Sequence, residues 1–252
     1  MTIEPTLAGL LRQDHSAVSR AVSLVENQAP EAGALLAALG PHLGRAHRIG
    51  ITGPPGAGKS TLTRALVEVW RRQGQSVAVV AVDPSSPVTG GALLGDRIRM
   101  EPVALDDSVF IRSMATRGAS GGLAHTTGQV CDVLDAAGYQ RIVIETVGVG
   151  QSEIAIIGVA QTTVLVLVPE SGDGIQMLKA GVMEGADLFG INKAERPEAA
   201  RLARDLELSQ RMRTVAASST GWSPPVLSTV AIAGTGVEAL AEAIASHRAS
   251  LG

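Results

Sequence analysis

One stretch decides the fold: Arg48-Ile49-Gly50-Ile51-Thr52-Gly53-Pro54-Pro55-Gly56-Ala57-Gly58-Lys59-Ser60-Thr61. Its apolar start predicts a strand, and apolar residues at helical spacing over 62–69 predict a helix after it. Between the two, Gly53, four further residues and then Gly58-Lys59-Ser60 match a phosphate-binding loop. The sequence therefore predicts a nucleotide site, formed by Gly53, Pro54, Pro55, Gly56, Ala57, Gly58, Lys59, Ser60 and Thr61.

Each residue type in this loop has a physical reason. Glycine lets the backbone N–H groups approach the phosphates, because a Cβ atom would block them. The Lys59 amine would reach the β- and γ-phosphates, and the Ser60 hydroxyl would hold Mg²⁺. An ordinary glycine-rich loop is the alternative, but the strand before it and the helix after it favour the nucleotide site.

The composition predicts an α/β protein with an aliphatic core. Of the 252 residues, 45% are hydrophobic but only 2% are aromatic, so Val, Ile, Leu and Ala must fill the interior. The net charge is −3 and the basic residues are scattered, which argues against a nucleic-acid partner. The single cysteine, Cys131, excludes an internal disulfide, and we expect it to be buried. No signal pattern or membrane-spanning run is found, so we expect a cytoplasmic protein. The five histidines form no pair at the spacing of transition-metal ligands, so no transition-metal site is expected.

Residues 1–44 precede the first predicted strand and form a predicted helical N-terminal extension to the main domain, residues 45–252. Apolar residues at helical spacing between 7 and 25 predict an amphipathic helix or helix pair, broken near Pro30. Packing against the main domain is the simpler interpretation, and a partner-binding arm is the alternative.

Further apolar runs over 76–82, 109–112, 141–145, 163–168 and 187–191 predict a mostly parallel sheet of about seven strands, because strands buried on both faces belong to parallel sheets. A helix is expected from Leu123 to Ala137, closed by Gly138.

Two of these strands end in carboxylates. Asp83 follows the strand over 76–82, and Asp96 lies further along the loop that begins at Asp83. Glu145 ends the strand over 141–145. Ligands collect at the carboxyl ends of strands in open α/β sheets, so Asp83, Asp96 and Glu145 are predicted to join Ser60 around Mg²⁺.

The loop after Glu145 would sense the γ-phosphate. The Gly148 N–H group is expected to contact that phosphate, and Gln151 is a candidate for orienting water. We expect Lys59, Asp83 and Glu145 to be the catalytic residues.

The strand over 187–191 delivers Asn192-Lys193-Ala194-Glu195. In guanine-specific proteins an Asn-Lys-x-Asp loop lies here, and its carboxylate accepts hydrogen bonds from guanine N1–H and N2–H₂, a donor pair that adenine lacks. Glu195 keeps the acceptor and is one methylene longer, so GTP is favoured over ATP.

The chain resembles the GTPases associated with methylmalonyl-CoA mutase, the MeaB/ArgK group of P-loop GTPases, over roughly residues 20–248. The most specific stretches are Ala46 to Gly56, Val82-Asp83-Pro84-Ser85-Ser86-Pro87, Gly95-Asp96-Arg97-Ile98-Arg99-Met100 and Glu145 to Glu153. They are much longer than generic NTPase signatures. The resemblance implies a three-layer P-loop GTPase that uses GTP and Mg²⁺.

The same resemblance implies a chaperone that loads cofactor into an adenosylcobalamin-dependent acyl-CoA mutase and protects that enzyme. It places partner sensing in the segment 170–179, where Asp173 and Lys179 are the residues to test. It also puts the second base loop at 225–231, with Val230 where many relatives have Ser, so that the backbone N–H groups of Val230 and Ala231 would face the base.

Other departures concern packing and assembly. Gly185 and Gly190 stand where the family usually has larger apolar residues. The chain stops at Gly252, so the C-terminal arm that helps form the family's dimer is expected to be absent, and a homodimer stays open. The alternatives are a metal-insertion GTPase, an ATPase or kinase linked to basic amino-acid transport, and a non-hydrolysing interaction module.

Overall fold

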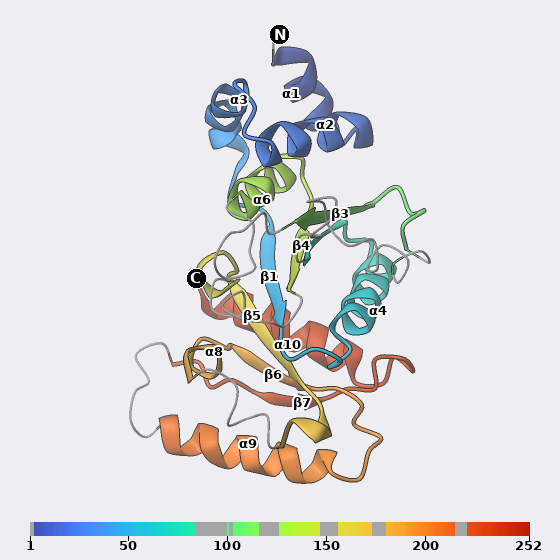
Figure 1. Ribbon diagram of the computed structural model, residues 1–252, viewed down its shortest axis with the longest axis vertical. Helices are drawn as coiled ribbons and strands as arrows, with labels where there is room; N and C mark the ends of the chain where they lie inside the picture. The colour runs from blue at the N-terminus through green and yellow to red at the C-terminus, as the bar shows by residue number, and fades with distance from the viewer. Residues whose placement is uncertain are drawn as a thin grey trace.

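The computed structural model describes residues 3–83, 100, 103–115, 126–146, 156–172, 180–214 and 221–252. Within these ranges one parallel sheet runs through the molecule in the order β3-β2-β4-β1-β5-β6-β7 (Figure 1). The strands are β1 His47–Thr52, β2 Val77–Asp83, β3 Val109–Ala115, β4 Arg141–Thr146, β5 Thr162–Leu167, β6 Leu188–Ile191 and β7 Val226–Ser228. The predicted seven-stranded, mostly parallel sheet is confirmed, and all neighbouring strands of this sheet run parallel.

Helices cover both faces of this sheet, which confirms the three-layer α/β fold. The α-helices are α1 Glu4–Leu10, α2 His15–Glu26, α3 Ala32–Leu39, α4 Lys59–Arg72, α6 Thr127–Ala136, α8 Ala180–Glu184, α9 Ala199–Thr214 and α10 Val237–Ser250. Short 3₁₀ turns are η1 Gly40–His42, η2 Ile156–Gly158 and η3 Pro169–Gly172. None of the helices in the described ranges combines the length and apolar character needed to cross a bilayer.

The strands alternate their side chains between two apolar clusters, as a pleated strand must. In β2, Ala78 and Val80 pack with α2, α3 and α6, whereas Val77 and Val79 pack with α4 and α10. A third cluster joins α8 and α9 to β5 and β6. The aliphatic core predicted from the composition is therefore split over both faces of the sheet.

Residues 4–39 form three helices rather than the predicted single helix or pair. The break near Pro30 is confirmed, since α2 ends at Glu26 and α3 begins at Ala32. The prediction missed the break before α2, where Gln13 has a φ of 60° and the Asp14 side chain accepts a hydrogen bond from the Ala17 N–H group at 2.8 Å. An Asp N-cap starts a new helix because it satisfies a backbone donor that the helix itself leaves unpaired. The division of the chain at residue 44 stays a prediction.

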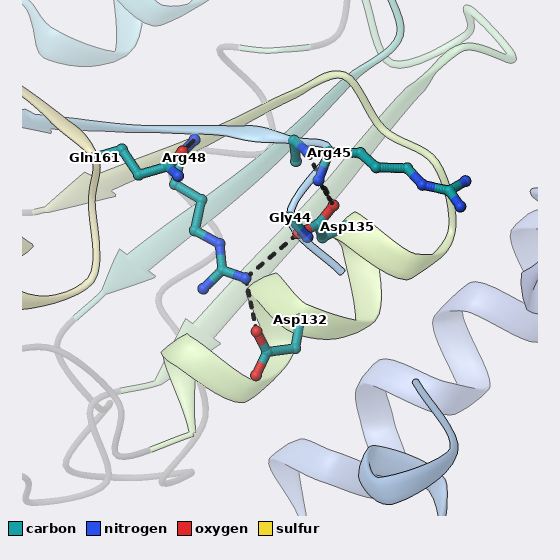
Figure 2. A network of polar contacts seen from close by, with 7 residues as sticks. Gly44, Arg45, Arg48, Asp132, Asp135 and Gln161 are labelled. Carbon is teal, nitrogen blue, oxygen red and sulfur yellow. Dashed lines mark hydrogen bonds and ion pairs between the residues drawn. The ribbon is translucent and has the colours of Figure 1, made fainter. Parts of the chain in front are cut away.

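A carboxylate fixes the segment that connects these helices to β1. Asp135 of α6 accepts backbone hydrogen bonds from Gly44 at 2.8 Å, Arg45 at 3.0 Å and Ala46 at 2.9 Å. The Arg48 guanidinium lies over the same helix, 2.6 Å from Asp132 and 3.7 Å from Asp135 (Figure 2). The entry into β1, and hence the phosphate loop that follows it, is anchored to α6.

Two predictions about α6 are confirmed. Cys131 is fully buried, and this burial raises the pKa of its thiol to about 12. Gly138 follows the helix with a φ of 91°, the left-handed conformation expected for a glycine at a helix C-terminus.

Candidate nucleotide-binding site

The phosphate loop lies between β1 and α4, as predicted, and two of its glycines are required by close contacts. Gly53 has a φ of 139°, and a Cβ atom there would lie 2.0 Å from the Val166 carbonyl oxygen of β5. Gly58 has a φ of 82°, and its Cβ would lie 2.4 Å from Nδ2 of Asn192. The loop is thus packed against the ends of β5 and β6, in a backbone conformation that larger residues do not tolerate.

Lys59 begins α4 and folds its side chain back over this loop. Its Nζ donates hydrogen bonds to the carbonyl oxygens of Gly53 at 2.8 Å and Pro54 at 3.0 Å. The residue is only 6% exposed, so its ammonium group is held at the mouth of the loop. A cation in this position, at a helix N-terminus, is suited to bind an anion.

Ser60 and Glu145 meet at the carboxyl end of the sheet. The Ser60 hydroxyl donates to Oε1 of Glu145 at 2.5 Å, and both residues are buried. Parallel register produces this contact, because Glu145 lies level with Ile51 of β1 and with Ala81 of β2. A hydroxyl and a carboxylate offer the hard oxygen ligands that Mg²⁺ prefers, so this pair fits a magnesium site.

The remaining metal ligands are described only in part. Asp83 is the last residue of β2 and lies level with Ala115 of β3, which puts its backbone at the same edge of the sheet as Glu145. Its side chain lies outside the described part of the structure, as do the whole of Asp96 and Gly148.

The residues predicted to orient water and to sense the partner also lie outside the described part of the structure. Gln151, Asp173 and Lys179 fall outside the described residues. Their predicted roles stay predictions.

Asn192 links the phosphate loop to both base loops. Its Nδ2 donates to the Ala57 carbonyl at 2.9 Å, and its Oδ1 accepts from the Ala231 N–H group at 3.1 Å and from the Thr229 hydroxyl at 3.4 Å. Sequence reasoning placed Asn192 in the base loop and missed both this bridge and Thr229. No local sequence signal marks this bridge. It follows from the order of the strands in the structure, since β1, β5 and β6 are adjacent and deliver these loops to one edge.

The base loops are shaped by backbone hydrogen bonds. Lys193 has a φ of 57°, Ala194 N–H donates to the Thr229 carbonyl at 3.1 Å, and Glu195 is exposed. The N–H groups of Val230 and Ala231, predicted to face the base, both have acceptors within the protein: Val230 N–H donates to the Thr235 carbonyl at 2.9 Å. The exposed Glu195 carboxylate, beside two hydrogen-bonded turns, is therefore the group at this place that could accept hydrogen bonds from a base.

Comparisons with known proteins cover this whole site. A family model described as methylmalonyl Co-A mutase-associated GTPase MeaB matches residues 18–252. A Pyrococcus horikoshii protein named as a GTPase is 48% identical over 246 residues, which span 98% of this chain and 78% of the relative. The Escherichia coli GTPase ArgK is 36% identical over 260 residues, covering 100% of this chain and 78% of ArgK. Among solved structures, one described as LAO/AO transport system kinase superposes with a TM-score of 0.80 and 29% identity, over 99% of this chain and 76% of that one.

Proposed function

Since this chain belongs to the MeaB family of methylmalonyl-CoA mutase-associated GTPases, we propose that its hydrolysis of GTP serves an adenosylcobalamin-dependent acyl-CoA mutase. The chain is a P-loop GTPase that converts GTP and water to GDP and phosphate. The proposed service is cofactor loading and protection of the mutase in the cytoplasm. The observation that supports this partner is the family match over residues 18–252.

Lys59 carries the phosphate chemistry in this proposal. Its Nζ leaves the carbonyl oxygens of Gly53 and Pro54 and donates to the β- and γ-phosphate oxygens of bound GTP. The backbone N–H groups of the loop from Gly56 to Thr61 and the N-terminus of α4 complete an anion site. Charge that develops during in-line attack of water is then met by a fixed cation.

Ser60, Glu145, Asp83 and Asp96 would hold Mg²⁺ in this proposal. The buried contact between the Ser60 hydroxyl and the Glu145 carboxylate supports the first two. When bound, the ion would neutralise charge on the β- and γ-phosphate oxygens. By accepting from the Ser60 hydroxyl, Glu145 fixes that hydroxyl at the carboxyl end of β4.

In this proposal, Asn192, Lys193 and Glu195 select guanine over adenine. Asn192 fixes the loop by its contacts with Ala57 and Ala231, and the exposed Glu195 carboxylate accepts from guanine N1–H and N2–H₂. The carboxylate would meet no such donor pair on adenine. GDP should therefore bind far more tightly than ADP.

The direct test measures phosphate release from GTP with and without purified methylmalonyl-CoA mutase of the same organism. We expect the mutase to change the rate by about tenfold or more, because completing a GTPase site in trans has effects of at least that size. Lys59→Ala should abolish turnover in both conditions. Arg64→Ala is the matched control on the same helix, since the Arg64 guanidinium pairs with Glu68 one turn away rather than with a residue of the phosphate loop.

The outcomes separate the activity from the partner. Unchanged GTP turnover in Lys59→Ala would reject the site assignment. The wild-type protein could instead hydrolyse GTP at the same rate, bind nucleotides with the same affinity and leave adenosylcobalamin transfer to apo-mutase unchanged, whether or not the two proteins are combined. That result would reject the proposed partner but not the GTPase activity.

A further inference from the structure

Two threonines meet where the neighbouring strands β4 and β1 end. The Thr146 hydroxyl donates to the Thr52 hydroxyl at 3.2 Å, and the two residues are only 1% and 0% exposed. Parallel register produces the pair, because Ile51 of β1 lies level with Glu145 of β4, and the next residue of each strand is therefore level as well. The hydroxyl pair joins the two strands at the point where β1 enters the phosphate loop.

The last two residues of β4 hold the phosphate loop from opposite faces of the sheet. Val143 packs in the cluster that contains α4, and side chains alternate along a strand, so Glu145 also faces α4. There it accepts from Ser60, at the far end of the loop. Thr146 points to the other face, where it contacts Thr52, the residue that precedes the loop.

The position of Thr52 decides the position of Gly53, the first residue of the loop. Gly53 is already packed tightly on the side of β5, because a Cβ atom on it would lie 2.0 Å from the Val166 carbonyl oxygen. Its own carbonyl oxygen accepts from Nζ of Lys59 at 2.8 Å. A shift of the Thr52 backbone would therefore move the group that holds the Lys59 ammonium.

We infer that Thr146 and Thr52 are positioning residues for GTP hydrolysis, whose hydroxyl pair fixes the start of the phosphate loop and, through Gly53, the Lys59 ammonium. The inference rests on the role of Lys59 in the proposed function. A cation stabilises the transition state best when it is in place beforehand, so a small displacement costs more in rate than in binding of the ground state. Loss of the pair should lower kcat and change nucleotide affinity little.

Phosphate release from GTP, together with calorimetry using GDP and Mg²⁺, tests the inference on the full chain. Thr146→Val keeps the shape of the side chain and removes the donor. We expect its kcat to fall about tenfold, because one buried hydrogen bond between neutral groups is lost. The KM for GTP and the affinity for GDP should stay within about threefold of the wild type.

The second strand offers an independent variant of the same contact. Thr52→Val removes the acceptor and should lower kcat as Thr146→Val does, which also provides the reading if Thr146→Val does not fold. The double variant should be no slower than either single variant, because the two hydroxyls make one contact and their effects do not add. Thr146→Ser restores the hydroxyl and should bring kcat to within about threefold of the wild type.

Thr162→Val is the matched control for a purely structural loss. The Thr162 hydroxyl is also buried and lies between His47 and His247, but at the amino end of β5, the end of the sheet opposite to the phosphate loop. Its removal should lower the midpoint of thermal unfolding and leave kcat unchanged.

Four results would overturn the inference. They are a wild-type kcat in the valine variants at 146 and 52, no recovery in Thr146→Ser, an equal fall of kcat in Thr162→Val, and a loss of GDP affinity as large as the loss of kcat. The third would mean that any loosening of the sheet slows hydrolysis, and the fourth that the pair holds the nucleotide and does not position Lys59. Unchanged turnover in Lys59→Ala would instead defeat the proposed site, whatever the threonine variants do.

Discussion

The Thr162 hydroxyl donates a hydrogen bond to Nδ1 of His247 across 2.8 Å, joining the start of β5 to α10. The contact belongs to a longer chain, in which the Arg141 guanidinium lies 2.8 Å from His47 Nδ1, and His47 Nε2 lies 2.7 Å from the Thr162 oxygen. At the far end, His247 Nε2 lies 3.3 Å from Oδ1 of Asp187.

Donor chemistry sets the direction of this chain. Arginine can only donate, so His47 must accept at Nδ1 and carry its proton on Nε2. Thr162 accepts that proton and donates to His247, whose own Nε2 proton then faces the Asp187 carboxylate. Both imidazoles are neutral with one tautomer each, and the chain holds α10 against the amino ends of the strands.

Acid should weaken the fold through His47. Burial above all, with the nearby positive charges of Arg141 and Arg248, lowers the pKa of His47 to about 3. As the pH falls from 6.5 toward 3, the unfolded chain binds a proton that the folded chain refuses, so this share of stability is full above pH 6.5 and shrinks below it. The slope from this one group reaches about 1.4 kcal/mol per pH unit. Urea unfolding at pH 7.5, 6.0 and 5.0 measures it.

His47→Gln is the control for the acid effect. Its amide can accept from Arg141 and donate to Thr162 without titrating, so the loss of stability between pH 7.5 and 5.0 should be smaller than in the wild type. Asp187, whose pKa is raised chiefly by burial, acts in the opposite sense in both proteins. Equal pH slopes in the two proteins would contradict the role of His47.

Asn192 should support both halves of the nucleotide site. Asn192→Ala removes its contacts with Ala57, Thr229 and Ala231 and leaves buried partners unsatisfied, at a cost of about 1–3 kcal/mol each. We expect weaker binding of both GDP and pyrophosphate, whereas Glu195→Ala should weaken GDP alone. Calorimetry distinguishes the two patterns, and normal pyrophosphate binding in Asn192→Ala would refute the bridge.

Gly190 in β6 should be replaceable with a gain. Its φ is not positive, and an added Cβ would lie 3.8 Å from Cγ1 of Val164, an ordinary packing distance. Gly190→Ala should raise the free energy of unfolding by about 0.5–1 kcal/mol, because alanine restricts the unfolded chain. Gly185→Ala is the matched control, since its Cβ would lie 2.3 Å from Cδ1 of Ile157 and should give no gain. Thermal unfolding of both variants decides the matter.

Tyr139 should tolerate the loss of its hydroxyl. The side chain is 1% exposed beside Phe110, and among the described residues its hydroxyl has no hydrogen-bond partner. A buried unsatisfied hydroxyl costs about 1–3 kcal/mol, so Tyr139→Phe should be as stable as the wild type or more stable. A clear drop in the urea midpoint would show that the hydroxyl is satisfied.

The sequence by itself determined the sheet, the phosphate loop and the end of α6, because strand periodicity, glycine spacing and a C-terminal glycine are local signals. Only the tertiary structure decided which distant groups meet. Ser60 and Glu145 are 85 residues apart, and Asn192 and Ala57 are 135 apart. Parallel pairing in the order β4-β1-β5-β6 brings each pair to one edge of the sheet, and no local pattern encodes that order. The same holds for the chain from Arg141 to Asp187. Four of its members begin or border four different strands, the fifth, His247, lies in α10, and they look unrelated until the fold aligns them.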